Sequence, residues 1–325
     1  MAGSDAFSQL LGSIDKDFAK RLPDFHKARR EGMALLVTLL LSVRSVNLME
    51  LAEALPRKIK SKDHRYQFIE RILSNQHIVP DEVMKPFAQG VFKRLTGQGQ
   101  TLVLMMDQSK INELNEVLML SVRIRKRAIP VAWRVRQTKG NIGFEVQKEL
   151  LDAIRDWIPA GVDVMLAADR FYGTEKLIGW CQQAGWGYRI RLKGNLTLQH
   201  QGGELTTGEA VELMPEGLEK AELYGSGVFT NIGILHEKGH PEPWIIAMDA
   251  KPGKYKVLDY GLRWAIEPMF SDGKSRGFNM DESHIQRPDK MEKLLLIIAI
   301  AMYWAVSCGA CEEWKNVAPD EQKRG

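Results

Sequence analysis

Apolar positions recur with a helical period over the first part of the chain. Residues 33–43 are mostly apolar, and the stretches 48–55, 64–73 and 83–95 carry apolar residues three or four positions apart. One face of each stretch would therefore be apolar when it forms a helix. The pattern predicts an all-helical N-terminal domain over residues 1–97.

After this region the pattern changes to that of strands alternating with helices. Short apolar or alternating runs predict strands, and longer amphipathic runs predict helices. The order is three strands, a helix, a strand, a helix and a strand, which predicts an α/β domain. The expected strands are 101–106, 116–125, 128–135, 162–168 and 188–192, and the expected helices are 145–157 and 174–183.

The second half of the chain adds two further segments. Residues 194–255 are rich in glycine with short alternating stretches, which predicts a β-rich insertion after a first core part at 98–193. Residues 256–325 would complete the core with a helix. Their apolar run 294–306 is expected to be a buried helix, because thirteen residues are too few to cross a hydrocarbon layer of about 30 Å.

Composition narrows the class of protein. With 44% hydrophobic and 26% charged residues the chain is globular, and a net charge of +4 permits a polyanionic partner without requiring one. The basic stretch 56–65 (PRKIKSKDHR) either contacts a DNA backbone or is a solvated loop. The N-terminus lacks the pattern of a secretion signal. We therefore expect a cytoplasmic protein that does not associate with membranes.

The most specific pattern in the chain is Tyr-x2-Arg-x3-Glu-x6-Lys. It is formed by Tyr260, Arg263, Glu267 and Lys274. At about 100° per residue these four side chains fall on one helix face, where a carboxylate would bind a metal ion and its neighbours would hold phosphates. Pro268 is expected to bend this helix between Arg263 and Lys274.

Two further acidic residues follow apolar runs. Asp107 closes the expected strand 101–106, and Asp169 closes the strand 162–168. If these two strands are neighbours, their carboxylates would converge at one edge of the sheet, with Glu267 supplied by the later helix. Each acid also has a simpler interpretation, as a turn or helix cap for the aspartates and as an ion-pair partner of Arg263 for Glu267.

Three converging carboxylates would repel one another unless divalent cations neutralise them. Mg²⁺ prefers oxygen ligands of this kind, completed by water and phosphate. Two such ions about 4 Å apart activate an attacking hydroxyl and stabilise a departing oxygen in one in-line displacement. The combination of Asp107, Asp169 and Glu267 therefore predicts a metal-dependent phosphoryl-transfer site.

These residues and motifs resemble those of the DDE transposases of bacterial insertion sequences, in the group that carries the Tyr-x2-Arg-x3-Glu-x6-Lys signature. The resemblance covers residues 101–304, including the segments MDQSK and ADRFYG. It implies that Asp107, Asp169 and Glu267 are the catalytic and metal-binding residues. It also implies a ribonuclease H-like catalytic core with a β insertion between the second and third acids, which is an α/β fold with an all-helical N-terminal domain.

The resemblance further implies an activity. This is cut-and-paste transposition, with Mg²⁺-dependent cleavage of the element ends and joining of the 3′ hydroxyls to target DNA; we expect Mn²⁺ to substitute. The partners would be double-stranded DNA, both element ends and target, and a second copy of the chain in a homodimeric DNA complex associated with the nucleoid. Two alternatives remain open, a nuclease with a similar core and a DNA-binding regulator that has lost catalysis.

Several residues are expected to contact DNA. Tyr260, Arg263 and Lys274 are implied by the resemblance to hold the backbone near the cut. Trp264 either stacks on a base flipped out of the duplex or is buried against the sheet. Arg170 either meets phosphate or pairs with an acid, and the last two candidates, Lys193 and Asn195, are DNA contacts or ordinary loop residues.

Overall fold

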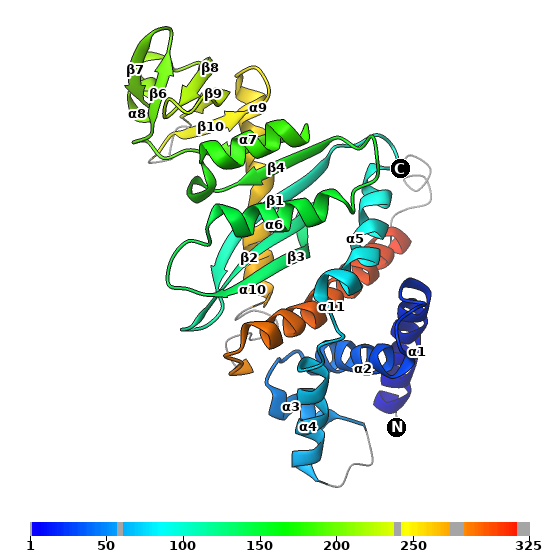
Figure 1. The fold of residues 1–325 in the computed structure, drawn as a ribbon. Coiled ribbons are helices and arrows are strands. Elements are labelled where there is room, and N and C mark those ends of the chain that lie inside the picture. Colours follow the sequence, from blue (N-terminus) through cyan, green and yellow to red (C-terminus); the bar gives the residue numbers. More distant parts are fainter. Residues whose placement is uncertain (1, 57–60, 237–241, 274–282, 317–325) are drawn as a thin grey trace. The chain divides into compact units, whose positions relative to one another are not determined.

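Two compact units make up the protein (Figure 1). One consists of residues 1–88 and 270–325, and the other of residues 89–269. This division differs from the four segments expected from the sequence, because the C-terminal helix belongs to the same unit as most of the N-terminal helices. The expected domain boundaries remain a prediction. The computed structural model describes residues 2–56, 61–236, 242–273 and 283–316.

The N-terminal region is helical, as predicted. Local capping helps to fix these helices; for example, the Asn47 side chain accepts a hydrogen bond from the backbone amide of Met49 at 3.0 Å. Residues 57–60 of the basic stretch lie outside the described residues, so its two interpretations remain open. The helices are α1 (Ala2–Arg21), α2 (Lys27–Val43), α3 (Leu48–Ala54), α4 (Lys62–Leu73) and α5 (Pro80–Thr96).

The expected buried C-terminal helix is α11 (Pro288–Asn316), which packs against α2 and α4. Phe18, Phe87 and Tyr303 form an edge-to-face cluster in the same unit, with ring centroids 5.5 Å apart in each successive pair. The helix is longer than the thirteen-residue apolar run, and Pro288–Cys308 is long and apolar enough to span a membrane, so its length does not exclude a span as expected. Its most apolar window is 67% buried, as expected of a core helix.

In the described part of the second unit, ten strands form one mixed sheet in the order β3-β2-β1-β4-β5-β10-β9-β8-β6-β7. The parallel pairs are β1 with β4 and β4 with β5, and the other pairings are antiparallel. The core strands are β1 (Leu102–Lys110), β2 (Asn115–Ile124), β3 (Arg127–Gln137), β4 (Val164–Ala168) and β5 (Gly187–Arg191).

The expected β insertion is present, and it extends the same sheet instead of forming a separate one. Strand β10 pairs with the core strand β5, and β9 pairs with β10. A short helix, α8 (Thr207–Leu213), begins with a capping box in which Thr206 and Glu209 exchange side-chain and backbone hydrogen bonds. The strands are β6 (Thr197–His200), β7 (Gly203–Thr206), β8 (Leu218–Leu223), β9 (Phe229–Leu235) and β10 (Trp244–Met248).

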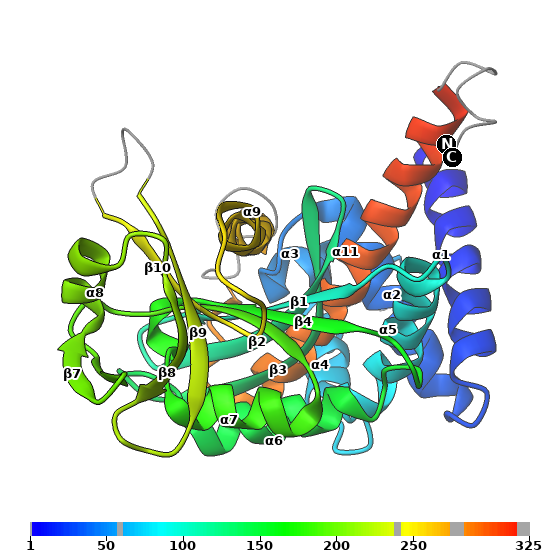
Figure 2. The same cartoon turned by 90° about the horizontal axis from the view of Figure 1, so that it is seen from above.

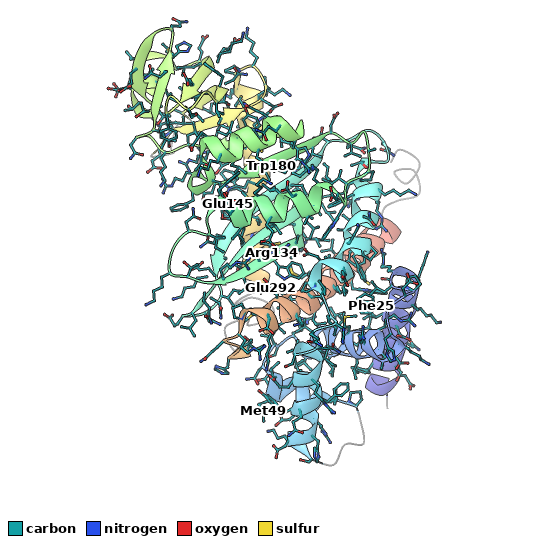
Figure 3. The ribbon with its side chains drawn as sticks, in the orientation of Figure 1. Phe25, Met49, Arg134, Glu145, Trp180 and Glu292 are labelled. Atoms are coloured by element: carbon teal, nitrogen blue, oxygen red, sulfur yellow. The ribbon has the colours of Figure 1, made fainter. Side chains whose placement is uncertain are left out.

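Helices cover both faces of the core sheet (Figure 2). One face carries α6 (Phe144–Arg155), which contacts β3, and α7 (Glu175–Ala184), which contacts β5. The indole of Trp180 on α7, labelled in Figure 3, lies in this layer. It donates a hydrogen bond to Asp152 on α6 at 3.0 Å, which ties the two helices together. The opposite face is crossed by the segment that follows α9 (Lys254–Leu258).

This crossing segment contains the first three residues of the signature, but they do not lie on one α-helix as expected. Tyr260 and Arg263 lie on a 3₁₀ helix, η2 (Asp259–Ala265), and Glu267 lies in the first turn of α10 (Ile266–Gly273). Pro268 is the third residue of α10, where its missing amide hydrogen costs nothing because the amides of a first turn have no partner within the helix. The α-helix therefore begins just before Pro268, and Tyr260 and Arg263 still share a face because a 3₁₀ helix repeats every three residues.

Candidate active site

The two aspartates meet because of the register between β1 and β4. The last parallel pair joins Met106 to Ala168, so Asp107 and Asp169 are each one residue beyond it on neighbouring strands. Adjacent strands lie about 4.8 Å apart, which brings the two carboxylates to the same point of the sheet. The predicted adjacency of these strands is confirmed.

The local setting of the two aspartates differs from the prediction in one respect. Asp107 does not end its strand, because β1 stays paired with β2 as far as Lys110. Asp169 does follow the end of β4, and its side chain accepts a hydrogen bond from the Arg170 amide, which caps the 3₁₀ helix η1 (Arg170–Tyr172). The capping interpretation of Asp169 is therefore correct, and it is compatible with membership of the acid cluster.

A single guanidinium connects all three carboxylates. Arg263 donates from Nη1 to Asp107 at 2.9 Å, and from Nη2 to Asp169 at 3.4 Å and to Glu267 at 3.3 Å. Its Nε donates to the hydroxyl of Tyr260 at 3.2 Å. The side chain of Arg263 is only 7% exposed, whereas that of Glu267 is 59% exposed. The signature segment is thus bound to the sheet through the residues expected to be catalytic.

Burial and charge act in opposite directions at this cluster. Burial raises the pKa of the Asp107 carboxyl above its usual range; the Arg263 guanidinium opposes this shift and the Asp169 carboxylate adds to it. Burial lowers the pKa of Arg263, but Tyr260, Asp107 and Asp169 outweigh it and the net shift is upward. The site therefore combines a firmly cationic arginine with an aspartate that is costly to ionise without a cation nearby.

The three carboxylates suit a divalent cation by their chemistry. They supply hard oxygen donors, and they already converge on one cationic group, the guanidinium of Arg263. Among the described residues, no cluster of three or more His, Cys, Asp or Glu side chains stands close enough to hold a metal ion. Asp107, Asp169 and Glu267 would have to close around an ion that replaces or displaces this guanidinium.

A buried tyrosine beside the acids was missed in the sequence. Tyr172 is 1% exposed, and its hydroxyl has no hydrogen-bond partner among the described residues. Burial, followed by the charges of Asp107 and Asp169, raises the pKa of this hydroxyl, so it stays protonated near neutral pH. The residue lies only three positions after Asp169, but nothing in its type or spacing distinguishes it from a core tyrosine.

The predicted DNA contacts within the signature have different surroundings. Tyr260 is 2% exposed and Arg263 is engaged with the acids, so neither is open at the surface here. Trp264 is 47% exposed and packs edge to face against Trp244 at 5.3 Å, so of its two interpretations, burial against the sheet is wrong. Lys274 lies outside the described residues. The DNA roles of these residues remain predictions.

The three other candidates lie near the same edge of the sheet. Lys193 and Asn195 are exposed after β5, and the Lys193 ammonium lies 5.2 Å from the ring centroid of Phe171. Of the two interpretations of Arg170, pairing with an acid is the one observed, because it donates to Glu242 at 3.2 Å. Their contacts with DNA remain predictions as well.

Comparison with known proteins assigns this domain to a family. Residues 143–304 match the family model described as Transposase DDE domain, a segment that includes Asp169 and Glu267. Through this segment the chain belongs to the transposase DDE domain family. No curated protein matches the sequence. Among solved structures, human ENDOV is similar over 69% of this chain and 98% of its own, at 11% identity and a TM-score of 0.26, which is too weak to support a conclusion.

Membership of this family has general consequences. A transposase DDE domain suggests transposase activity and implies a DNA-processing enzyme that binds DNA. It also implies a ribonuclease H-like core, and proteins of this family typically use divalent metals. The mixed sheet with helices on both faces and the helical N-terminal region agree with the fold class expected from the sequence.

Proposed function

We propose that this chain is a cut-and-paste DNA transposase that cleaves the ends of an insertion sequence and joins the 3′ hydroxyls to target DNA. One observation carries the proposal. In a chain with a transposase DDE domain, the carboxylates of Asp107, Asp169 and Glu267 converge on a single cationic group. Three carboxylates that already share one cationic group could hold the two divalent ions of phosphoryl transfer once they close around them.

In this proposal the three acids hold Mg²⁺, and Mn²⁺ substitutes for it. The bound ions would supply Lewis-acid activation of a water or 3′ hydroxyl and neutralise charge on the departing oxygen. Asp107 and Asp169 are fixed by the strands of the sheet. Glu267 is carried by a helical segment and is more exposed, so it is the acid with the greatest freedom to adjust.

Arg263 and Tyr260 position this site. The arginine balances the acids in the structure, and in the active complex we expect its guanidinium to turn to a backbone phosphate, as the signature implies. Lys274 and Trp264 would hold the same DNA segment. We further propose that the complex contains two copies of the chain, one for each element end, and that it works in the cytoplasm on nucleoid DNA.

The proposal can be tested with purified protein and a supercoiled plasmid that carries the DNA flanking the coding region. With Mg²⁺ or Mn²⁺ we expect cleavage at the element ends and joined products with a second plasmid. Asp107→Asn, Asp169→Asn and Glu267→Gln should each abolish both reactions. Glu219→Gln is the control, because Glu219 is an exposed acid that pairs with Lys251 in the insertion.

Other outcomes identify the alternatives. Cleavage without joined product would indicate a nuclease with a similar core. DNA binding without cleavage under any of these conditions would indicate a regulator that has lost catalysis. Cleavage that survives all three substitutions would show that the acid cluster is not the active site.

A further inference from the structure

Two arginines at the edge of the sheet share one carboxylate oxygen. Nη1 of Arg170 and Nη2 of Arg191 each lie 3.2 Å from the same oxygen, Oε2 of Glu242. The side chains of Arg170, Arg191 and Glu242 are 45%, 22% and 61% exposed, so the group is open to solvent. An anionic oxygen held between two guanidiniums has the environment that a phosphate oxygen finds in many binding sites.

Strand register places this pair beside the acids. The last pair between β4 and β5 joins Ala168 to Ile190, so Arg191 is one residue beyond it, as Asp169 is on β4. Arg170 directly follows Asp169. Arg191 also lies close enough to Tyr260 to oppose the rise in the pKa of the tyrosine that burial causes. A phosphate held by the two arginines would therefore lie next to the acid cluster.

A cavity beside the arginine pair has room for a phosphate group. Its volume is about 530 Å³, and the charged residues that line it are Arg170, Arg191, Lys193, Glu212 and Glu242. Lys193 adds a third positive charge to this lining. Glu242 is the acid in contact with both arginines, and exposed ion pairs of this kind contribute little to stability. A phosphodiester could displace Glu242 at small cost.

We propose that Arg170 and Arg191 form a phosphate-binding fork for the DNA backbone next to the cleavage site, and that Glu242 competes with DNA for it. This inference rests on the proposed function, because it assumes a DNA substrate. It adds two residues, Arg191 and Glu242, to those expected from the sequence. It also gives Glu242 a defined effect, since its carboxylate occupies the position of a phosphate oxygen and weakens DNA binding.

The test measures the affinity of the full chain for a short DNA duplex of arbitrary sequence by fluorescence anisotropy at several salt concentrations. Glu242→Gln should bind about three- to tenfold more tightly than the wild type. Glu219→Gln removes the same charge from another exposed ion pair in the insertion, and should change the affinity by less than about twofold. Comparing the two separates loss of the competitor from a change in net charge.

Arg191 provides the second part of the test. Arg191→Ala should weaken binding and reduce the slope of log affinity against log salt by about one, the value for one lost phosphate contact. In the double variant with Glu242→Gln, the gain in affinity should disappear. Glu242 is exposed, so Glu242→Gln is expected to fold. Its result can be interpreted even if Arg191→Ala does not fold.

The outcomes distinguish this inference from the proposed function. If Glu242→Gln binds DNA no more tightly than Glu219→Gln, while the wild type binds and cleaves, the fork is wrong and the transposase proposal stands. If Glu242→Gln binds DNA more tightly than Glu219→Gln, but neither the wild type nor any variant cleaves DNA, the fork stands and the transposase proposal fails. A gain that persists in the double variant would also overturn the fork.

Discussion

Arg263 donates a hydrogen bond from Nη1 to Oδ2 of Asp107 at 2.9 Å, joining residues 156 positions apart in the sequence. The contact connects the signature segment with the first strand of the sheet. It also means that the guanidinium and a divalent cation would use the same carboxylate oxygens. Arginine binding and metal binding at Asp107 should therefore oppose each other.

This competition predicts that removing the guanidinium strengthens metal binding. Arg263→Gln should bind Mn²⁺ at least about tenfold more tightly than the wild type, a difference of about 1.4 kcal/mol, because a fixed positive charge is removed from beside the ion. Isothermal titration of EDTA-treated protein with Mn²⁺ measures the effect. Arg136→Ala is the control, since it removes a half-exposed arginine that pairs with Glu149. Equal or weaker binding by the Gln variant would contradict the prediction.

The raised pKa of Asp107 predicts a pH effect on stability. In the folded protein this carboxyl binds its proton more tightly than in the unfolded chain, where its pKa is about 3.9. Stability is therefore lost as pH rises from that value through the folded pKa. Asp107→Asn cannot lose a proton, so without metal it should become increasingly more stable than the wild type over this window. Urea unfolding at a series of pH values measures the difference.

Asp152 supplies a control of opposite sign. The hydrogen bond from Lys148 is the main cause that lowers the pKa of Asp152. Its contribution should be present above the unfolded pKa and be lost as pH falls through the folded pKa. Asp152→Asn should thus be less stable than the wild type near pH 7, and the gap should close in acid. If the Asp107 variant behaved in the same way, burial would not be the dominant effect at Asp107.

Much of this arrangement follows from local patterns in the sequence. The apolar runs predict the five core strands within a few residues, because strands buried on both faces need continuous apolar residues. An acid that follows such a run is expected at the edge of the sheet where ligands bind, and Asp169 does follow the end of β4. The spacing of Tyr260 and Arg263 places both on one face whether the helix is α or 3₁₀.

What the sequence did not predict depends on long-range pairing. That Asp107 lies inside its strand depends on where β2 stops pairing, and no residue near Asp107 marks that point. The role proposed for Arg191 depends on its register with Asp169. The contact of Arg263 with three acids depends on how the signature segment crosses the sheet. Hydrophobic periodicity contains no information about register between distant strands.

The unpartnered hydroxyl of Tyr172 predicts an unusual tolerance to substitution. Removing a buried hydroxyl that makes no hydrogen bond costs little and relieves its desolvation, so Tyr172→Phe should be as stable as the wild type or more stable. Tyr188 is the matched control, because the residue is 2% exposed, against 1% for Tyr172, and its hydroxyl bonds Thr230 at 2.9 Å and Gln182 at 3.1 Å. Tyr188→Phe should lose about 0.5–1.5 kcal/mol. Thermal unfolding of the two variants measures both stability changes. A larger loss of stability for Tyr172→Phe than for Tyr188→Phe would show that the Tyr172 hydroxyl has a hydrogen-bond partner.

Gly173 holds the segment after Asp169 against β5, and its substitution should damage the site. A Cβ atom at this position would lie 2.7 Å from the carbonyl oxygen of Arg191 and 2.9 Å from Leu192 Cδ2, so the backbone must move. Gly173→Ala should lose about 1–3 kcal/mol of stability, and DNA cleavage should fall further than the stability loss explains, because Asp169 precedes the displaced turn. Gly140→Ala is the control, since a Cβ there meets nothing within 4 Å. Denaturant unfolding and cleavage assays on both variants test this, and full cleavage by a folded Gly173→Ala protein would show that the packing of this turn does not position Asp169.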